Sequence, residues 1–173
     1  NVNASSISTG TLPKARLPSG SILQVVQSAK TDVFSTSSTS YTDVTGMSVS
    51  ITPASTSNKI LVICGVSFGS TTVDRYAIFG RLMRNGSAIF IADAASNRDR
   101  GTFSYQMGGF EGPLNLHFNY LDSPSSTSSV TYNIQIRAES PQTAYINRGL
   151  EADGDSSITP RTASSITVME IVG

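Results

Sequence analysis

Apolar residues along this chain occur in short blocks, and three of the blocks alternate clearly between apolar and polar positions. These alternating segments are 47–51, 113–122 and 130–137. A period of two predicts β-strands that bury one side and leave the other in water. The predicted inward residues of the second segment are Leu114, Leu116, Phe118 and Tyr120.

Two other blocks are more continuously apolar. Segment 59–68 (KILVICGVSF) predicts a central strand buried on both sides, because its β-branched content and its glycine disfavour a helix. Segment 165–172 (SITVMEIV) predicts the closing strand of the domain. Its expected inward residues are Ile166 and Val168 together with Met169 or Ile171.

An Asn-Gly pair separates two apolar-rich runs, 76–84 and 87–92. A type I′ turn needs a positive φ at both central residues, which Asn and Gly adopt readily, so Asn85 and Gly86 predict a β-hairpin. Shorter strand candidates are 21–29, 102–106 and 143–147.

The pattern gives eight to ten short strands, each followed by turn residues, and no helix. We therefore predict an all-β fold, an antiparallel β-sandwich of jelly-roll type, as one domain over 21–173. An immunoglobulin-like sandwich is the alternative, but it has fewer strands and usually a core Trp, and the chain has no Trp. Pro13 and Pro18 predict an extended arm over 1–20, with a flexible linker as the alternative. Because the first residue is Asn1, we expect the chain to be cut from something longer.

The composition excludes several classes of function and leaves the predicted fold unchanged. The chain has 29 Ser and 18 Thr among 173 residues, only 14% charged residues and zero formal net charge. A neutral chain is not expected to attract nucleic acid, which requires a basic field. No apolar run is long enough for a membrane span, and one Cys rules out an internal disulfide. We expect no cofactor.

The residues that usually carry catalysis are scarce. His117 is the only His and should point away from the buried face of its strand, and Cys64 lies within the most apolar block. Nucleophilic catalysis needs a base beside the nucleophile, so we expect no enzyme. The acidic turn that contains Asp153 and Asp155 could supply oxygen ligands to a hard cation, although a solvated turn is favoured and no metal is expected.

Two segments, 97–105 and 145–148, combine Arg, Asn and Tyr, the residue types that offer large contact areas with a polar handle. The candidate receptor-binding residues are Asn97, Arg98, Asp99, Arg100, Tyr105, Tyr145, Asn147 and Arg148. The alternative is intramolecular, with Asp99 paired to a neighbouring Arg so that the loop is merely capped.

Several stretches carry a resemblance to a known family. Segment 7–18 (ISTGTLPKARLP) resembles the segment that joins the shaft of bacteriophage fibres to a terminal domain. The rest resembles the C-terminal domains of fibre-like virion proteins of marine tailed phages. The stretches that carry this likeness are SGSILQVVQ (19–27), 34–50, SNKILV (57–62), RLMRNG (81–86), YLDSP (120–124) and RTASSITVME (161–170).

The resemblance implies a homotrimeric knob at the virion surface, outside cells, joined to an upstream shaft. Such a knob attaches the phage to a host surface receptor, either a saccharide or an outer-membrane protein. The first alternative is a structural head fibre or capsid decoration protein without a dedicated receptor site. A glycan depolymerase and a cellular trimeric ligand of similar topology are further alternatives.

Overall fold

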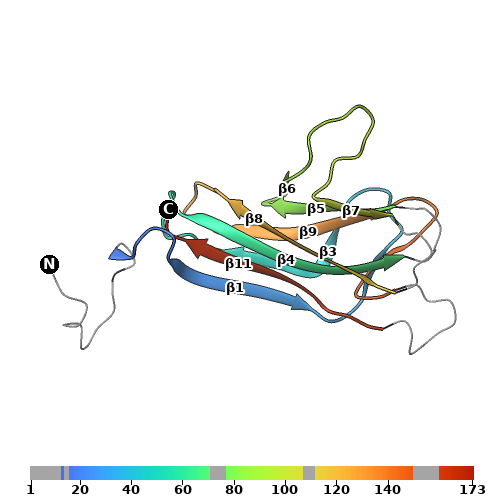
Figure 1. Cartoon of the computed structure of the whole chain (residues 1–173), viewed down its shortest axis with the longest axis horizontal. Coiled ribbons are helices and arrows are strands. Elements are labelled where there is room, and N and C mark those ends of the chain that lie inside the picture. Colours follow the sequence, from blue (N-terminus) through green and yellow to red (C-terminus); the bar gives the residue numbers. More distant parts are fainter. Residues whose placement is uncertain (1–12, 14–15, 71–76, 107–111, 150–159) are drawn as a thin grey trace.

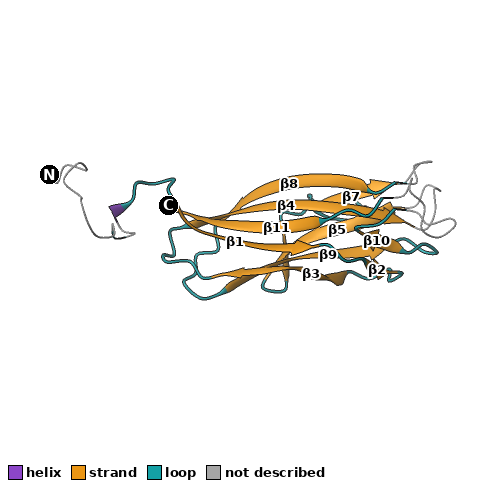
Figure 2. Cartoon of the chain, turned by 90° about the horizontal axis from the view of Figure 1, so that it is seen from below, coloured by secondary structure: helices purple, strands orange, loops and turns teal. Residues whose placement is uncertain are grey.

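The computed structural model describes residues 13, 16–70, 77–106, 112–149 and 160–173, and within these ranges the protein is built from β-strands without an α-helix. The strands form two antiparallel sheets packed face to face, which Figure 2 shows edge-on. The strands are β1 (Ile22–Lys30), β2 (Phe34–Thr36), β3 (Thr42–Ile51), β4 (Lys59–Ser70), β5 (Ala77–Arg84), β6 (Ser87–Ile89), β7 (Phe103–Gln106), β8 (Leu114–Asp122), β9 (Val130–Ala138), β10 (Ala144–Ile146) and β11 (Ser164–Ile171).

The strand pairs are nested along the chain. The first strand β1 pairs with the last, β11, then β3 with β9, β4 with β8, and β5 with β7. Successive pairs alternate between the two sheets, which run β1-β11-β4-β8 and β3-β9-β5-β7 (Figure 1). A long hairpin wrapped in this way into two four-stranded sheets is a jelly roll, so the predicted fold class is confirmed. In the first sheet the short strand β10 pairs with the end of β4 and with β2, and in the second sheet β6 pairs with β5.

The core lies between the sheets and contains the alternating residues that the sequence assigned to it. Val130, Tyr132, Ile134 and Ile136 of β9 are buried, and the predicted residues of β8 pack against the same core. The turn between β5 and β6 has φ values of 48° at Asn85 and 80° at Gly86, which confirms the hairpin.

A buried polar cluster joins the sheets near one end. Asp122 of β8 accepts hydrogen bonds from the Tyr132 hydroxyl at 2.6 Å and from Arg84 Nη1 at 2.7 and 2.9 Å. The bond to Asp122 raises the pKa of Arg84, while burial, followed by the same carboxylate, raises the pKa of Tyr132. Because these bonds link β8 to β5 and β9, they hold the two sheets in register.

Two predictions about the first sheet, which contains β4 and β11, are wrong. Strand β4 is buried on both sides only from Val66 onward, whereas Leu61 is partly exposed and Ile63 is 39% exposed on the outer side. In β11 the inward position belongs to Glu170, so Met169 and Ile171 point outward and are only partly buried.

Glu170 is stable inside because three donors surround its carboxylate. The side chains of Gln24 and Asn58 and the backbone N–H of Ala54 each donate to it at 2.6 Å. A buried charge is tolerated when it is hydrogen-bonded in this way, and no count of apolar residues along the strand could reveal these distant donors.

The expected arm lies mostly outside the described residues. Its last turn, where the Ser21 N–H donates to the Pro18 carbonyl at 3.1 Å, is held against the C-terminal strand. The Gly20 N–H donates to the Val172 carbonyl and the Val172 N–H to the Ser21 carbonyl, both at 2.9 Å.

Candidate functional site

Strand β3 bulges away from its partner β9 and opens a hollow on the outer side of the second sheet. Asp43 lies opposite Gln135, and Ser48 lies opposite Asn133. Between these two pairs β3 therefore contains three more residues than β9. Gly46, with φ +88°, makes the change of direction, a conformation that other residues rarely adopt.

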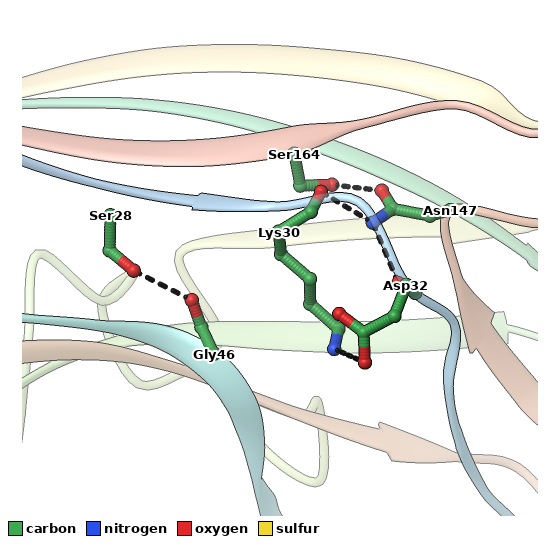
Figure 3. Close-up of polar contacts among 6 residues, drawn as sticks. All are labelled: Ser28, Lys30, Asp32, Gly46, Asn147 and Ser164. Atoms are coloured by element: carbon green, nitrogen blue, oxygen red, sulfur yellow. Dashed lines mark hydrogen bonds and ion pairs between the residues drawn. The ribbon is translucent and has the colours of Figure 1, made fainter.

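The bulge is held from beneath by β1. The Ser28 hydroxyl donates to the Gly46 carbonyl at 2.9 Å, and a Cβ at Gly46 would lie 3.6 Å from the buried Lys30 side chain. Figure 3 shows Lys30 reaching Asp32, whose carboxylate accepts from the Lys30 ammonium at 2.8 Å. This hydrogen bond lowers the pKa of Asp32.

The hollow has a volume of about 310 Å³ and is lined mainly by neutral hydrogen-bonding groups. Asp43 Oδ1 accepts from the Asn133 amide at 2.6 Å and from the Gln135 amide at 2.9 Å. The hydroxyls of Ser48 and Thr131 line the same space. With Thr45, the lining offers one carboxylate, two amides and three hydroxyls, which supply both donors and acceptors, as a ligand rich in hydroxyl groups requires.

Beside the hollow, arginines stack on aromatic rings. The guanidinium of Arg81, whose residue pairs with Gln135 across the sheet, lies 3.5 Å from the centre of the Tyr41 ring. The Arg137 guanidinium lies 4.0 Å from the centre of the Phe79 ring. Such cation–π contacts hold each guanidinium group against the face of a ring. We call Tyr41, Asp43, Arg81, Asn133 and Gln135 together the polar sheet face.

The predicted binding loop between β6 and β7, which projects from the sandwich in Figure 1, is fastened to this face by its base. Asp99 forms an ion pair with Arg137 of β9, so its partner is an Arg of a distant strand. Arg100 donates from Nε to the Ala92 carbonyl at 2.7 Å and accepts at its own carbonyl from Arg81 Nε at 3.2 Å.

The other predicted residues of this segment divide into two groups. Asn97 and Arg98 lie exposed in the loop. Tyr105 points inward, where its ring packs edge-on against Phe68 with centroids 5.8 Å apart, so it belongs largely to the core.

Asn147 is fully buried and does not contribute to any surface. Its Nδ2 donates to the carbonyls of Lys30 at 2.8 Å and Asp32 at 3.0 Å, and its Oδ1 accepts from the Ser164 hydroxyl at 2.6 Å (Figure 3). Its φ of 65° suits Asn, which tolerates the left-handed region better than most residues. The structure therefore gives Asn147 a structural role in place of the predicted binding role.

The second predicted segment does not meet the first. Tyr145 lies in β10 of the other sheet, and its ring is 4.5 Å from the Arg148 guanidinium. The two buried neighbours of Tyr145 in β10 place its side chain on the outer side, away from the polar sheet face. Asp153 and Asp155 lie outside the described residues, and among the described ones no cluster of three metal-ligating side chains occurs.

The sequence did not indicate the polar sheet face because its residues come from β3, from Tyr41 just before it, and from β5 and β9, and only the register of these strands brings them together. Gly46, next to the alternating segment 47–51, was the one local signal, because a Gly inside a strand indicates a bulge. The described part of the chain contains no helix that could cross a membrane.

Comparison with known proteins gives no family. No protein-family model and no curated protein matches the chain. Among solved structures, a chain from the structure of the infectious bursal disease virus Gx strain is similar to it with a TM-score of 0.39 and 13% identity. The match covers 95% of this chain and 46% of that chain, so this protein spans less than half of its structural neighbour.

Proposed function

We propose that this chain is a virion structural protein, the terminal knob of a phage fibre, and that its polar sheet face binds saccharides on the host surface. The resemblance to fibre proteins supports the virion role, the homotrimeric assembly and the junction with an upstream shaft. We choose a saccharide as the ligand because the polar groups that line the hollow beside Asp43 can pair with the hydroxyls of a sugar.

The geometry suits a weak site of about one sugar ring. The hollow lies at the small end of the usual size range of ligand pockets, so one site buries little ligand surface. The Asn133 and Gln135 amides, held by Asp43, would present their remaining hydrogen-bonding groups to the sugar. Arg81, which pairs with Gln135 across the sheet and stacks on the Tyr41 ring, would place a cation at the edge of the site. Three such sites on one knob would act together and raise the avidity well above the affinity of each.

We propose binding without turnover. Hydrolysis of a glycosidic bond uses two carboxyl groups on either side of the scissile bond. Of the residues that line the hollow, Asp43 alone carries a carboxylate, and two amides already share one of its oxygens.

A saccharide-binding assay tests the proposal. Immobilised lipopolysaccharides and capsular saccharides of candidate bacterial hosts are probed with the wild-type chain and with Asp43→Ala and Gln135→Ala. Each substitution removes a polar group on the outer side of the sheet, and we expect about a tenfold loss of affinity, corresponding to about 1.4 kcal/mol. Thr56→Ala, exposed in the turn between β3 and β4, is the matched control and should bind like the wild type.

Two results would overturn the proposal. If the wild-type chain binds none of the saccharides nor whole host cells, the chain lacks the attachment function and the structural fibre or decoration role takes its place. If the wild type binds but Asp43→Ala and Gln135→Ala bind equally well, the site lies elsewhere. Arg98→Ala then tests the exposed loop.

A further inference from the structure

The outer side of the first sheet carries a continuous apolar surface. Val25, Met169, Leu61 and Leu121 are direct cross-strand partners in β1, β11, β4 and β8, so they form one row across the whole sheet. Neighbouring strands are about 4.8 Å apart, which makes the row roughly 15 Å long. With Ile22, Ile63 and Ile171 on the same side, these residues form what we call the apolar sheet face.

This exposure is unusual for the molecule. Of the five large hydrophobic residues that are exposed in the described part of the chain, four lie here: Ile22 at 54%, Val25 at 53%, Leu121 at 49% and Ile63 at 39%. Single exposed apolar residues need no explanation, but a contiguous patch marks an interaction site. The apolar sequence of β4 is typical of a strand that is buried on both sides. Within a single chain, however, the part of β4 before Val66 is buried only on its inner side.

We propose that the apolar sheet face is where copies of this chain pack against one another. Copies related by a symmetry axis present the same face to one another, so a face with few charges avoids like-charge repulsion near the axis. The remaining outward residues of the four strands are mostly neutral, such as Gln27, Thr167 and Asn119, and Lys59 lies at the margin. The carboxylates of Glu170 and Asp122 point inward instead.

The area of this face reaches the threshold for a biological contact. Four strands at about 4.8 Å spacing and eight residues at about 3.3 Å rise give a face of roughly 500 Å². Two such faces bury roughly 1,000 Å² together, about the minimum for a biological interface, so contacts beyond the four strands would add to it. The polar sheet face is on the other sheet and stays free in such an assembly, so both surfaces can work at once.

This inference rests on the proposed assembly of the knob but not on saccharide binding. Sedimentation of the ligand-free chain therefore separates its failure from a failure of the attachment function. We expect the wild-type chain to sediment as a homo-oligomer. Leu121→Glu adds a charge to a side chain that is half exposed in one copy, so the fold should tolerate it. In the assembly that charge would be buried and unpaired, which should raise the dissociation constant about 100-fold.

The matched control is Ser50→Glu, which adds the same charge to an exposed position on the outer side of the second sheet and should leave the oligomer intact. Circular dichroism and thermal unfolding verify that both variants fold. Val25→Glu, on the opposite edge of the row, provides a second test if Leu121→Glu does not fold. A wild-type chain that stays monomeric at 100 µM (about the upper range for a specific contact), or glutamate variants that fold and still assemble, would overturn the proposal.

Discussion

A methyl group added at Gly80 should destabilise the protein by overfilling its core. Gly80 of β5 pairs directly with Phe103 of β7, and the Phe103 ring lies across the glycine. A Cβ at Gly80 would be 2.0 Å from Phe103 Cζ. The ring has little room to retreat, because it packs against Phe68 and Phe118 with centroids 5.9 and 5.8 Å apart.

The expected size follows from two opposing terms. Carbon atoms pack at about 3.5 Å, so the ring must move by roughly 1.5 Å, and overpacking of this kind costs about 1–3 kcal/mol. Replacing Gly by Ala in a strand conformation that Ala can adopt gains about 0.4–1 kcal/mol through the unfolded chain. We therefore expect Gly80→Ala to lower the free energy of unfolding by about 1–2 kcal/mol and the melting temperature by about 3–8 °C.

Urea unfolding of a double-mutant cycle measures this effect at one fixed protein concentration, since any self-association would couple stability to concentration. Phe103→Leu makes room for the methyl group, so Gly80→Ala should cost little in that background. Gly65→Ala is the control. Its Cβ would lie 2.9 Å from Nδ1 of His117, an exposed side chain that can rotate away.

Two results would rule out overpacking of Phe103 as the cause. The first is a Gly80→Ala variant as stable as the wild type, which would mean that the ring moves freely. The second is an equal loss of stability with and without Phe103→Leu, which would place the cost in the backbone instead of the core.

Three other predictions follow from buried polar and thiol groups. Burial raises the pKa of Cys64 to about 12, so the native protein should resist alkylation at pH 8 and react only as fast as it unfolds. Asn147→Ala should lose about 2–4 kcal/mol in urea unfolding, because Ser164 and two carbonyls lose their partner and Ala disfavours positive φ. The lowered pKa of Asp32 means that its bond to Lys30 stabilises the fold above the unfolded-state pKa of about 3.9 and is lost as the pH falls through the folded value. Asp32→Asn should therefore flatten the dependence of stability on pH in acid, as measured by thermal unfolding between pH 2 and 7 (about the range in which carboxylates titrate).

The sequence predicted most strands and most of their inward residues, because alternation is a local property of the chain, but it did not predict β2 or the first half of β3. It could not predict that Glu170 points inward, since the donors Gln24 and Asn58 are far away along the chain. The candidate site was placed less well for a related reason. The residue types were informative, but Asn147 turned out to bond internally, while Asp43 and Gln135 meet only through the strand register.

The open outer side of β4 is the most useful difference between expectation and structure. Residues such as Leu61 and Ile63 predicted burial on both sides, and a single chain leaves that side accessible. The self-association proposal reconciles the two observations, because the second cover would come from another copy.

In the proposed knob, one sheet holds the copies together while the other binds the saccharide. Hydroxyl-radical footprinting by mass spectrometry tests both parts in one experiment, on the full chain with and without a saccharide that it binds. Met169 reports on the apolar sheet face and Tyr41 on the polar sheet face. We predict that Met169 oxidises more slowly in the wild-type chain than in Leu121→Glu whether or not saccharide is present, and that Tyr41 becomes protected only when saccharide is added. Equal oxidation of Met169 in both proteins, or a Tyr41 rate that saccharide does not change, would contradict the account.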